Sequence, residues 1–203
     1  MILIERTSVM NLDGAIRGAR NPMNSWAKSD SYYDANGKFV LGPIDLDFGH
    51  RLAVSGSDHR KFLRQVFVTV DITAPLYWWK EFDTYKVGTV ANSCSTMHKI
   101  HAKAFDRDDF SHDRLDEGGL ALLDATVAYL EAERQKFISN KEDRQPWHNM
   151  IQMLPSSFNQ MRTVTLNYEN LISMYYPAAT TSWPSGTPSA TGSPPSPTPR
   201  SGF

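Results

Sequence analysis

The chain has 203 residues, and 21 lysines and arginines against 22 acidic residues give it a formal net charge of −1. Because the basic residues form no stripe, this balance argues against direct binding to DNA or RNA, although free nucleotides remain candidate ligands. No apolar run approaches a membrane span, the Met1–Ile4 start predicts no signal peptide, and the single cysteine, Cys94, excludes an internal disulfide, which together favour the reducing cytoplasm.

The N-terminal part of the chain predicts one strand and two helices around a loop. We expect the strand at residues 2–5, a short helix at 13–18, the loop at 30–38 and a second helix at 45–55. Pro22 lies just beyond the first helix, and Gly56 ends the second. The segment 58–64 is charged on all sides, so it is typical of a solvated helix end that leads into the next strand.

A strand followed by an aromatic helix is the clearest local pattern. Residues 66–73 carry an apolar side chain at every second position from Val66 to Ile72, which predicts a strand with one buried face. Pro75 ends the strand because it has no amide donor, and its fixed φ suits the first turn of a helix at 76–82. From composition alone, this block is a strand packed on an aromatic helix.

The C-terminal half predicts helices around one more strand. We expect a long amphipathic helix at 116–139, a second helix at 147–154, a turn and short strand at 158–166, and the start of a last helix at 167–176. Apolar residues recur along the long helix at helical spacing, while its charged residues fall on the opposite side. We therefore assign the long helix to the scaffold.

Two blocks of the chain resemble the flavin-dependent thymidylate synthases. The first runs through the strand, Ala74-Pro75, the aromatic helix and the loop 84–89, where the family carries Arg-His-Arg-x-x-Ser. The second runs from Leu154-Pro155 through Thr165-Leu166-Asn167, where the family carries Leu-Pro and then Thr-x-Asn. Together the blocks extend over residues 55–176. The resemblance implies an α+β fold with an antiparallel sheet flanked by helices, and a homotetramer whose sites lie between subunits.

The loop departs from the family pattern at the chemical positions. Thr84, Tyr85 and Lys86 stand where the family has Arg, His and Arg, so one cation remains to meet a phosphate. A lysine serves as a point charge but cannot make the bidentate contact of an arginine. Thr89 keeps a hydroxyl at the serine position. In the following segment Asn92 is displaced by one place and the family arginine is missing.

The resemblance assigns candidate binding residues position by position. Gln65, Tyr85, Lys86 and Asn167 would hold the flavin FAD, and Lys86, Thr89, Asn92 and Ser93 would hold the nucleotide dUMP. His59 is a looser alternative to Gln65, because the family places a flavin-holding histidine before the equivalent strand. Tyr85 is also compatible with a half-buried core tyrosine. No catalytic residue is assigned, since the resemblance predicts no obligatory cysteine nucleophile and Cys94 is expected to be a small buried residue.

Two other clusters have residue types that bind metals. Cys94, His98 and His101 have donor atoms suited to zinc, but their spacing is not standard and no fourth ligand is evident. The acidic run 106–113 lacks the spaced oxygen ligands and turn glycine of a calcium loop, so it is typical of a solvated surface loop. We therefore expect no metal site.

The composition changes at Pro177. The last 27 residues hold seven of the 12 prolines, with many Ser, Thr and Gly, and no Leu, Ile, Val, Asp, Glu or Lys. Such a segment cannot bury a core, so we expect one domain at 1–176 and a disordered tail at 177–203. Because the family continues a helix here, the tail is also explained as a frameshift product. A native flexible tail is the alternative.

The resemblance predicts thymidylate synthesis: methylation of dUMP to dTMP with methylenetetrahydrofolate and a flavin that NADPH reduces. The departures in the loop keep alternatives open. These are a catalytically inactive or altered-substrate nucleotide-binding relative, of the kind that phages carry, and a structural oligomer that binds no ligand.

Overall fold

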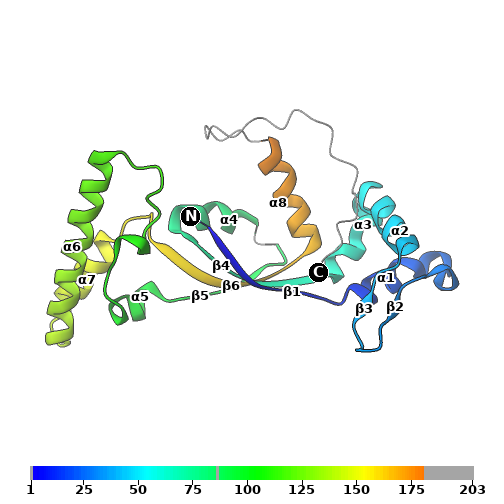
Figure 1. The fold of residues 1–203 in the computed structure, drawn as a ribbon, viewed down its shortest axis with the longest axis horizontal. Coiled ribbons are helices and arrows are strands. Elements are labelled where there is room, and N and C mark those ends of the chain that lie inside the picture. Colours follow the sequence, from blue (N-terminus) through cyan, green and yellow to red (C-terminus); the bar gives the residue numbers. More distant parts are fainter. Residues whose placement is uncertain (1, 86, 181–203) are drawn as a thin grey trace.

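The centre of the molecule is a four-stranded antiparallel sheet. The computed structural model describes residues 2–85 and 87–180, with side chains to residue 175. The strands are hydrogen-bonded in the order β1 (Leu3–Met10), β4 (Phe67–Pro75), β6 (Asn159–Asn167) and β5 (Val90–Ser93). Helices lie on one face of the sheet and at both of its ends (Figure 1). This arrangement confirms the predicted α+β class with an antiparallel sheet flanked by helices.

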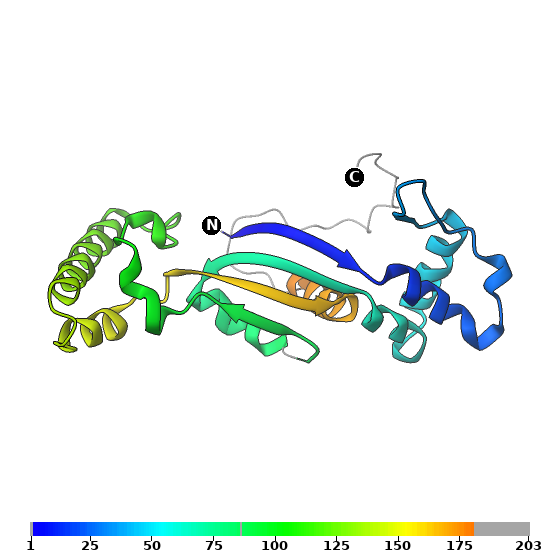
Figure 2. The ribbon, with the colours of Figure 1, turned by 90° about the horizontal axis from the view of Figure 1, so that it is seen from below.

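The alternating pattern of β4 builds the core on one face of this sheet. Val68, Val70 and Ile72 are buried and pair with positions on β6 that include the equally buried Val164 and Leu166. The helix α4 (Leu76–Phe82) covers this face with Trp79 and Phe82, and the helix α8 (Tyr168–Thr180) lies beside it. Over the opposite face, no described helix is drawn in either view (Figures 1 and 2).

Helices at each end of the sheet form two further apolar clusters. At one end α6 (Glu117–Ser139) packs on α7 (Gln145–Met153) through residues that include the fully buried Leu130 and Met150. At the other end α1 (Leu12–Arg20) packs on the turn η3 (Lys61–Gln65) through Ile16, Phe62 and Val66. No helix of the described residues is long and apolar enough to cross a membrane.

The remaining elements are one 12-residue helix, α2, and several shorter helices, strands and turns. They are the helices α2 (Pro43–Val54), α3 (Ser57–Arg60) and α5 (Thr96–Lys99), the strands β2 (Tyr32–Tyr33) and β3 (Phe39–Val40), and the 3-10 turns η1 (Asn21–Met23), η2 (Trp26–Lys28), η4 (Asp83–Tyr85), η5 (Ile100–Ala102) and η6 (Arg107–Asp109).

Four features differ from the sequence-based expectations. The strand expected at 2–5 continues to Met10 as β1. The loop expected at 30–38 contains most of a hairpin, since β2 pairs with β3 across a turn that the Asp34 carboxylate and Gly37, with a positive φ of 75°, hold together. The strand β5 was not predicted, because all four of its residues are exposed and show no burial pattern. The last helix extends to Thr180, beyond the expected boundary at 176, and the tail from 181 lies outside the described residues.

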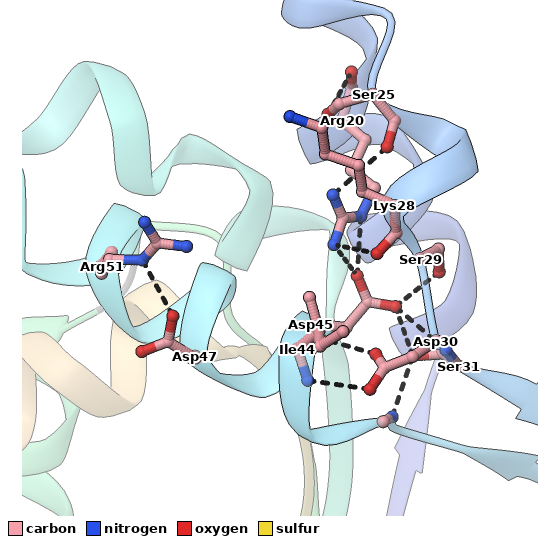
Figure 3. Close-up of polar contacts among 11 residues, drawn as sticks. Arg20, Ser25, Lys28, Ser29, Asp30, Ser31, Ile44, Asp45, Asp47 and Arg51 are labelled. Atoms are coloured by element: carbon pink, nitrogen blue, oxygen red, sulfur yellow. Dashed lines mark hydrogen bonds and ion pairs between the residues drawn. The ribbon is translucent and has the colours of Figure 1, made fainter.

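A buried ion pair fixes the helical end that contains α1 and α2. The guanidinium of Arg20 donates from Nε to Asp45 Oδ1 over 2.7 Å, and both side chains are almost fully buried (Figure 3). The other oxygen of Asp45 accepts from the hydroxyls of Ser29 and Ser31, each over 2.5 Å. Although burial by itself raises the pKa of Asp45, these hydrogen bonds lower it below its ordinary value. The pair therefore joins α1, α2 and the loop between them.

A variant that lacks the Asp45 carboxylate should unfold at a lower denaturant concentration than the wild type. Asp45→Asn leaves the buried Arg20 cation without its counter-charge, and breaking a buried pair costs about 3–5 kcal/mol. Asp47→Asn is the matched control, because Asp47 pairs with Arg51 on the exposed side of the same helix and exposed pairs contribute about 0–1 kcal/mol. Urea unfolding measures both. Equal midpoints for the two variants would contradict the structural importance of the buried pair.

The carboxylate of Glu131 should make the free energy of unfolding depend on pH in the acid range. Hydrogen bonds from Arg134, assisted by those from Gln135 and the Phe105 backbone, lower the pKa of Glu131 from 4.5 to about 2. Because the folded pKa is depressed, the stabilisation is complete above pH 4.5 and is lost as the pH falls towards 2. Glu131→Gln should therefore flatten the dependence of the unfolding free energy on pH in this range. Glu142→Gln, in an exposed turn, should leave the wild-type slope, and an unchanged slope in Glu131→Gln would contradict the assignment.

Candidate functional site

The two blocks that carry the family resemblance meet where β4 begins and β6 ends. Phe67, the first residue of β4, pairs with Asn167, the last residue of β6. The chain then turns into α8, and the backbone N–H of Tyr168 donates to the carbonyl of Val66 over 3.1 Å. Gln65 ends the turn just before β4. The antiparallel register therefore places Gln65 and Asn167, about 100 residues apart in sequence, at the same end of the sheet.

Asn167 and Asn170 form a reciprocal cap at the start of α8. The Oδ1 of Asn167 accepts from the Asn170 backbone N–H, and the Oδ1 of Asn170 accepts from the Asn167 backbone N–H, both over 3.0 Å. This is the geometry of a capping box, with asparagine at both positions. Asn170 was not predicted as a site residue, yet an asparagine three places after another at a helix start is a sequence signal for this cap.

The same pair holds the loop that precedes β5. Asn170 Nδ2 donates to the carbonyl of Val87, and Gly88 follows with a positive φ of 81°. A Cβ at Gly88 would lie 3.0 Å from Nδ2 of Asn167, closer than most side chains tolerate. The absence of a side chain at Gly88 and the two asparagines together allow the loop to lie directly against the start of α8.

The other predicted site residues are spread over this region. Tyr85 ends the turn η4 and is half-buried, and Thr89 is half-buried beside Gly88, whereas Lys86 lies outside the described residues. Gln65 is exposed, and its side chain lies against Gly18 of α1, where a Cβ would be 3.1 Å from Oε1 of Gln65. The looser candidate His59 is exposed on α3. The half-buried position of Tyr85 is compatible with both a ligand-binding role and a place in the core.

Asn92 and Ser93 are exposed on β5 and point to opposite faces of the sheet. Asn92 pairs with Thr163, which belongs to the face that no described helix covers. This face is polar at its centre, where the hydroxyl of Thr163 donates to Asp71 over 2.6 Å. Ser93 pairs with Arg162 on the other side. The two predicted nucleotide ligands therefore cannot contact one small molecule from the same side of the sheet.

Arg162 is a cation near these residues that sequence reasoning did not single out. Its Cζ lies 4.3 Å from the centre of the Trp79 ring, and Nη1 lies 3.2 Å from a carboxylate oxygen of Asp83. Its Nε also donates to Gln160 Oε1 over 3.0 Å. The guanidinium is thus engaged on three sides, and it holds the end of α4 on β6.

Beyond β5, the chain lines a cavity of about 270 Å³ between the sheet and the turns that precede η6. Cys94 is exposed here, which corrects the expectation of a buried cysteine. Lys99 and Lys103 also line the cavity. Lys103 contacts the carboxylate of Asp109 over 2.6 Å, and this hydrogen bond raises its pKa above the ordinary value.

One buried oxygen bears on whether a flavin fits this region. Oε1 of Glu169, in the first turn of α8, accepts from Arg60 over 2.9 Å, while its buried Oε2 has no hydrogen-bond partner among the described residues. A buried acceptor without a donor is costly, and it is complementary to the hydroxyl and N–H donors that a flavin nucleotide offers. The start of α8 therefore offers an acceptor of matching chemistry, but its burial means that a ligand would meet it only if the side chains around it moved.

The candidate metal ligands do not assemble into a site among the described residues. No group of three or more His, Cys, Asp or Glu side chains in residues 2–85 and 87–180 lies close enough to hold a metal ion. The acidic run at 106–113 forms a capped turn, in which the Asp106 carboxylate accepts from Asp108 N–H and Arg107 pairs with Asp124.

Comparisons with known proteins bear on the fold. No family model and no curated protein matches the sequence. Among solved structures, the chain is similar to thymidylate synthase X (ThyX) from Helicobacter pylori with FAD and dUMP, at 14% identity and a TM-score of 0.56, over 85% of this chain and 81% of that chain. A second complex of the same Helicobacter pylori enzyme gives 15% identity, a TM-score of 0.54 and the same shares.

A third similar structure is a methylase of UMP as well as dUMP. It is the UMP/dUMP methylase PolB from Streptomyces cacaoi bound with 5-Br UMP, at 14% identity and a TM-score of 0.54, over 86% of this chain and 75% of that chain. At these identities the likeness shows that the chain has the fold of the flavin-dependent thymidylate synthases.

Removal of the Asn170 side chain should loosen both α8 and the loop before β5. Asn170→Ala deletes the hydrogen bonds to Asn167 and Val87, and loss of a cap costs about 1–2 kcal/mol. Backbone amides at 87–89 should also exchange faster with deuterium. Ser173→Ala is the control, because its exposed hydroxyl donates to the carbonyl of Glu169 in the same helix and does not contact the loop in the described residues. If amides 87–89 exchanged at the same rate in both variants, the loop would not depend on Asn170.

Proposed function

We propose that this protein is a flavin-dependent nucleotide methylase that converts dUMP to dTMP with methylenetetrahydrofolate as the carbon donor. The observation that carries the proposal is the meeting of Gly88 and Asn167, because it joins the two sequence blocks that resemble the flavin-dependent thymidylate synthases inside the fold of that family. NADPH is the proposed reductant. Reduced FAD, when bound, would supply the electrons of the transfer, so the task of the chain is to bind and orient.

The proposed flavin residues are Gln65, Tyr85, Lys86 and Asn167. Because Oδ1 of Asn167 already caps α8, its contribution to a ligand would be made by the Nδ2 donor, which faces the loop at Gly88. The ring of Tyr85 would stack on a planar ligand, and Lys86 would supply a positive charge for a phosphate.

The proposed nucleotide residues are Lys86, Thr89, Asn92 and Ser93. Lys86 and Thr89 are three positions apart in the sequence, so both would act on one phosphate. Asn92 and Ser93 face opposite sides of β5, and one chain would present only one of them to a given nucleotide. A homotetramer with sites between subunits would resolve this, since a second subunit would meet the other face. The homotetramer, the phage-type relationship and the cytoplasmic location remain proposals.

A second candidate is an inactive or altered-substrate relative that still binds a nucleotide or flavin. It is favoured by Thr84 and Tyr85, which stand where the family has arginine and histidine, because neither side chain carries a positive charge for a phosphate. Arg162 does not compensate, because it is held by Asp83 and Gln160. The UMP/dUMP methylase among the similar structures supports a change of substrate within this fold. A structural oligomer without ligands is the third reading.

The visible absorbance spectrum of the purified protein separates these candidates. We expect added FAD to give a protein-bound flavin band that dUMP perturbs, followed by dTMP formation when methylenetetrahydrofolate and NADPH are supplied. Lys86→Gln should weaken flavin or nucleotide binding about tenfold or more, because it removes a charge-assisted phosphate contact. Lys80→Gln, on the exposed side of α4, is the charge-matched control.

Other results of these measurements would favour one of the alternative functions. A flavin band without turnover, or turnover on UMP alone, would reject thymidylate synthesis and leave the relative with altered chemistry. Failure of both FAD and dUMP to raise the melting temperature would reject ligand binding, since a ligand at 100 times its Kd stabilises by about 2.7 kcal/mol.

A further inference from the structure

A cavity in the end of the molecule that contains α1 is not used by the proposed function. It has a volume of about 380 Å³ and lies between α1 and the hairpin β2–β3. None of the predicted flavin or nucleotide residues lines it. Small-molecule sites have volumes of roughly 300–1,000 Å³ and are mostly apolar with a few convergent polar groups. The size of this cavity is thus sufficient for a small ligand.

The walls of the cavity are held in place by buried polar contacts. Arg20, Ser29 and Ser31 line it, and all three bond to the carboxylate of Asp45 behind the wall (Figure 3). The guanidinium of Arg20 also donates to the carbonyls of Ser25 and Lys28 over 3.3 and 3.4 Å. The loop that forms one side of the cavity is therefore fixed before any ligand arrives, which lowers the entropic cost of binding.

Three aromatic side chains give the cavity a surface suited to a flat ring. Trp26 and Tyr33 line it and are 48% and 58% exposed, and the ring of Phe39 packs edge-on against Tyr33 with centroids 5.5 Å apart. The indole Nε1 of Trp26 donates to Asn21 Oδ1 over 2.9 Å, which sets the ring's orientation. Aromatic rings exposed at the wall of a preformed cavity favour stacking with a planar ligand.

The cavity is lined by one acidic side chain, Asp13, and two basic ones, Arg17 and Arg20, of which Arg20 is paired with Asp45. Asp13 and Arg17 are one helical turn apart on the same face of α1, and both line the cavity. Asp13 accepts from the hydroxyl of Tyr33, a bond that lowers its pKa and ties the hairpin to α1. Among the described residues, no hydrogen bond or ion pair engages the guanidinium of Arg17. Arg17 is therefore the open cation of this cavity, and guanidinium groups bind carboxylate and phosphate.

We propose that the cavity between α1 and the hairpin β2–β3 binds a planar aromatic molecule that carries one anionic group, with its ring on Trp26, Tyr33 and Phe39 and its anion on Arg17. The anion is either a phosphate, as in a nucleoside monophosphate, or a carboxylate, as in an aromatic acid. The site is separate from the loop at 83–89, so it does not depend on the proposed methylase activity.

Calorimetric titration of the full chain tests the proposal with AMP and 2-naphthoate as probes. We expect at least one to bind with a Kd below about 1 mM, and its uncharged counterpart, adenosine or 2-naphthamide, to bind about tenfold or more weakly. Tighter binding of AMP would identify the phosphate source, and tighter binding of 2-naphthoate the carboxylate source. Arg17→Gln should weaken the binding of the charged probe about tenfold or more. Arg51→Gln, which alters an exposed pair outside the cavity, should retain the wild-type Kd.

Tryptophan fluorescence locates the bound probe. The bound probe should change the emission of the wild type, and Trp26→Phe should remove that change while the other four of the five tryptophans remain. Failure of both charged probes to bind, or wild-type affinity in Arg17→Gln with an unchanged circular dichroism spectrum, would overturn the proposal. AMP binding that survives Arg17→Gln and is lost in Lys86→Gln would belong to the loop 83–89, and would also overturn it.

Discussion

The antiparallel pairing of β4 with β6 is the interaction on which the rest of this structure depends. Nine residue pairs join the two strands, from Phe67 with Asn167 to Pro75 with Asn159. The pairing buries Val68, Val70 and Ile72 against α4 and α8 on one side and fixes where α4 begins and α8 starts. Because side chains alternate between faces along a strand, a slip of one residue would move this entire apolar set to the open face. The register is therefore set by burial, and it determines which distant segments meet.

The start of α8 shows how structural and binding demands share the same groups. Asn167 was predicted as a flavin residue, and its side-chain oxygen Oδ1 caps the helix in partnership with Asn170. Asn170 in turn holds the loop at Val87, so the helix cap and the loop conformation are parts of one hydrogen-bonded unit. A ligand at this position would meet a preformed surface. Because Asn170 bonds directly to the loop at Val87, a change in the cap would also change the loop conformation.

The end of the molecule that contains α1 depends on a different kind of interaction. There the central element is a charged pair, Arg20 with Asp45, rather than an apolar ladder. Two serine hydroxyls and two backbone carbonyls complete the hydrogen bonding of this pair, which is why both charges can be buried. This network gives the long segment between α1 and α2 a fixed course beside α1, and the cavity lies along that course.

The sequence by itself determined the elements whose residues are buried in a regular pattern. The strand from Val66, the helix after Pro75 and the long helix ending at Ser139 were predicted close to their observed bounds, because alternation, a fixed proline φ and helical spacing act within a few residues. The resemblance in two separate blocks also indicated the fold.

Only the tertiary structure decided what local patterns do not encode. The exposed strand β5 has no burial pattern, and it is defined by its hydrogen bonds to β6. The hydrogen bond from Asn170 to Val87 and the pairing of Arg20 with Asp45 likewise depend on partners that lie far away in sequence. The sides to which Asn92 and Ser93 point are fixed only once β5 pairs with β6. These contacts form when the β4–β6 register and the apolar clusters bring distant segments together, and a single sequence does not specify such distances.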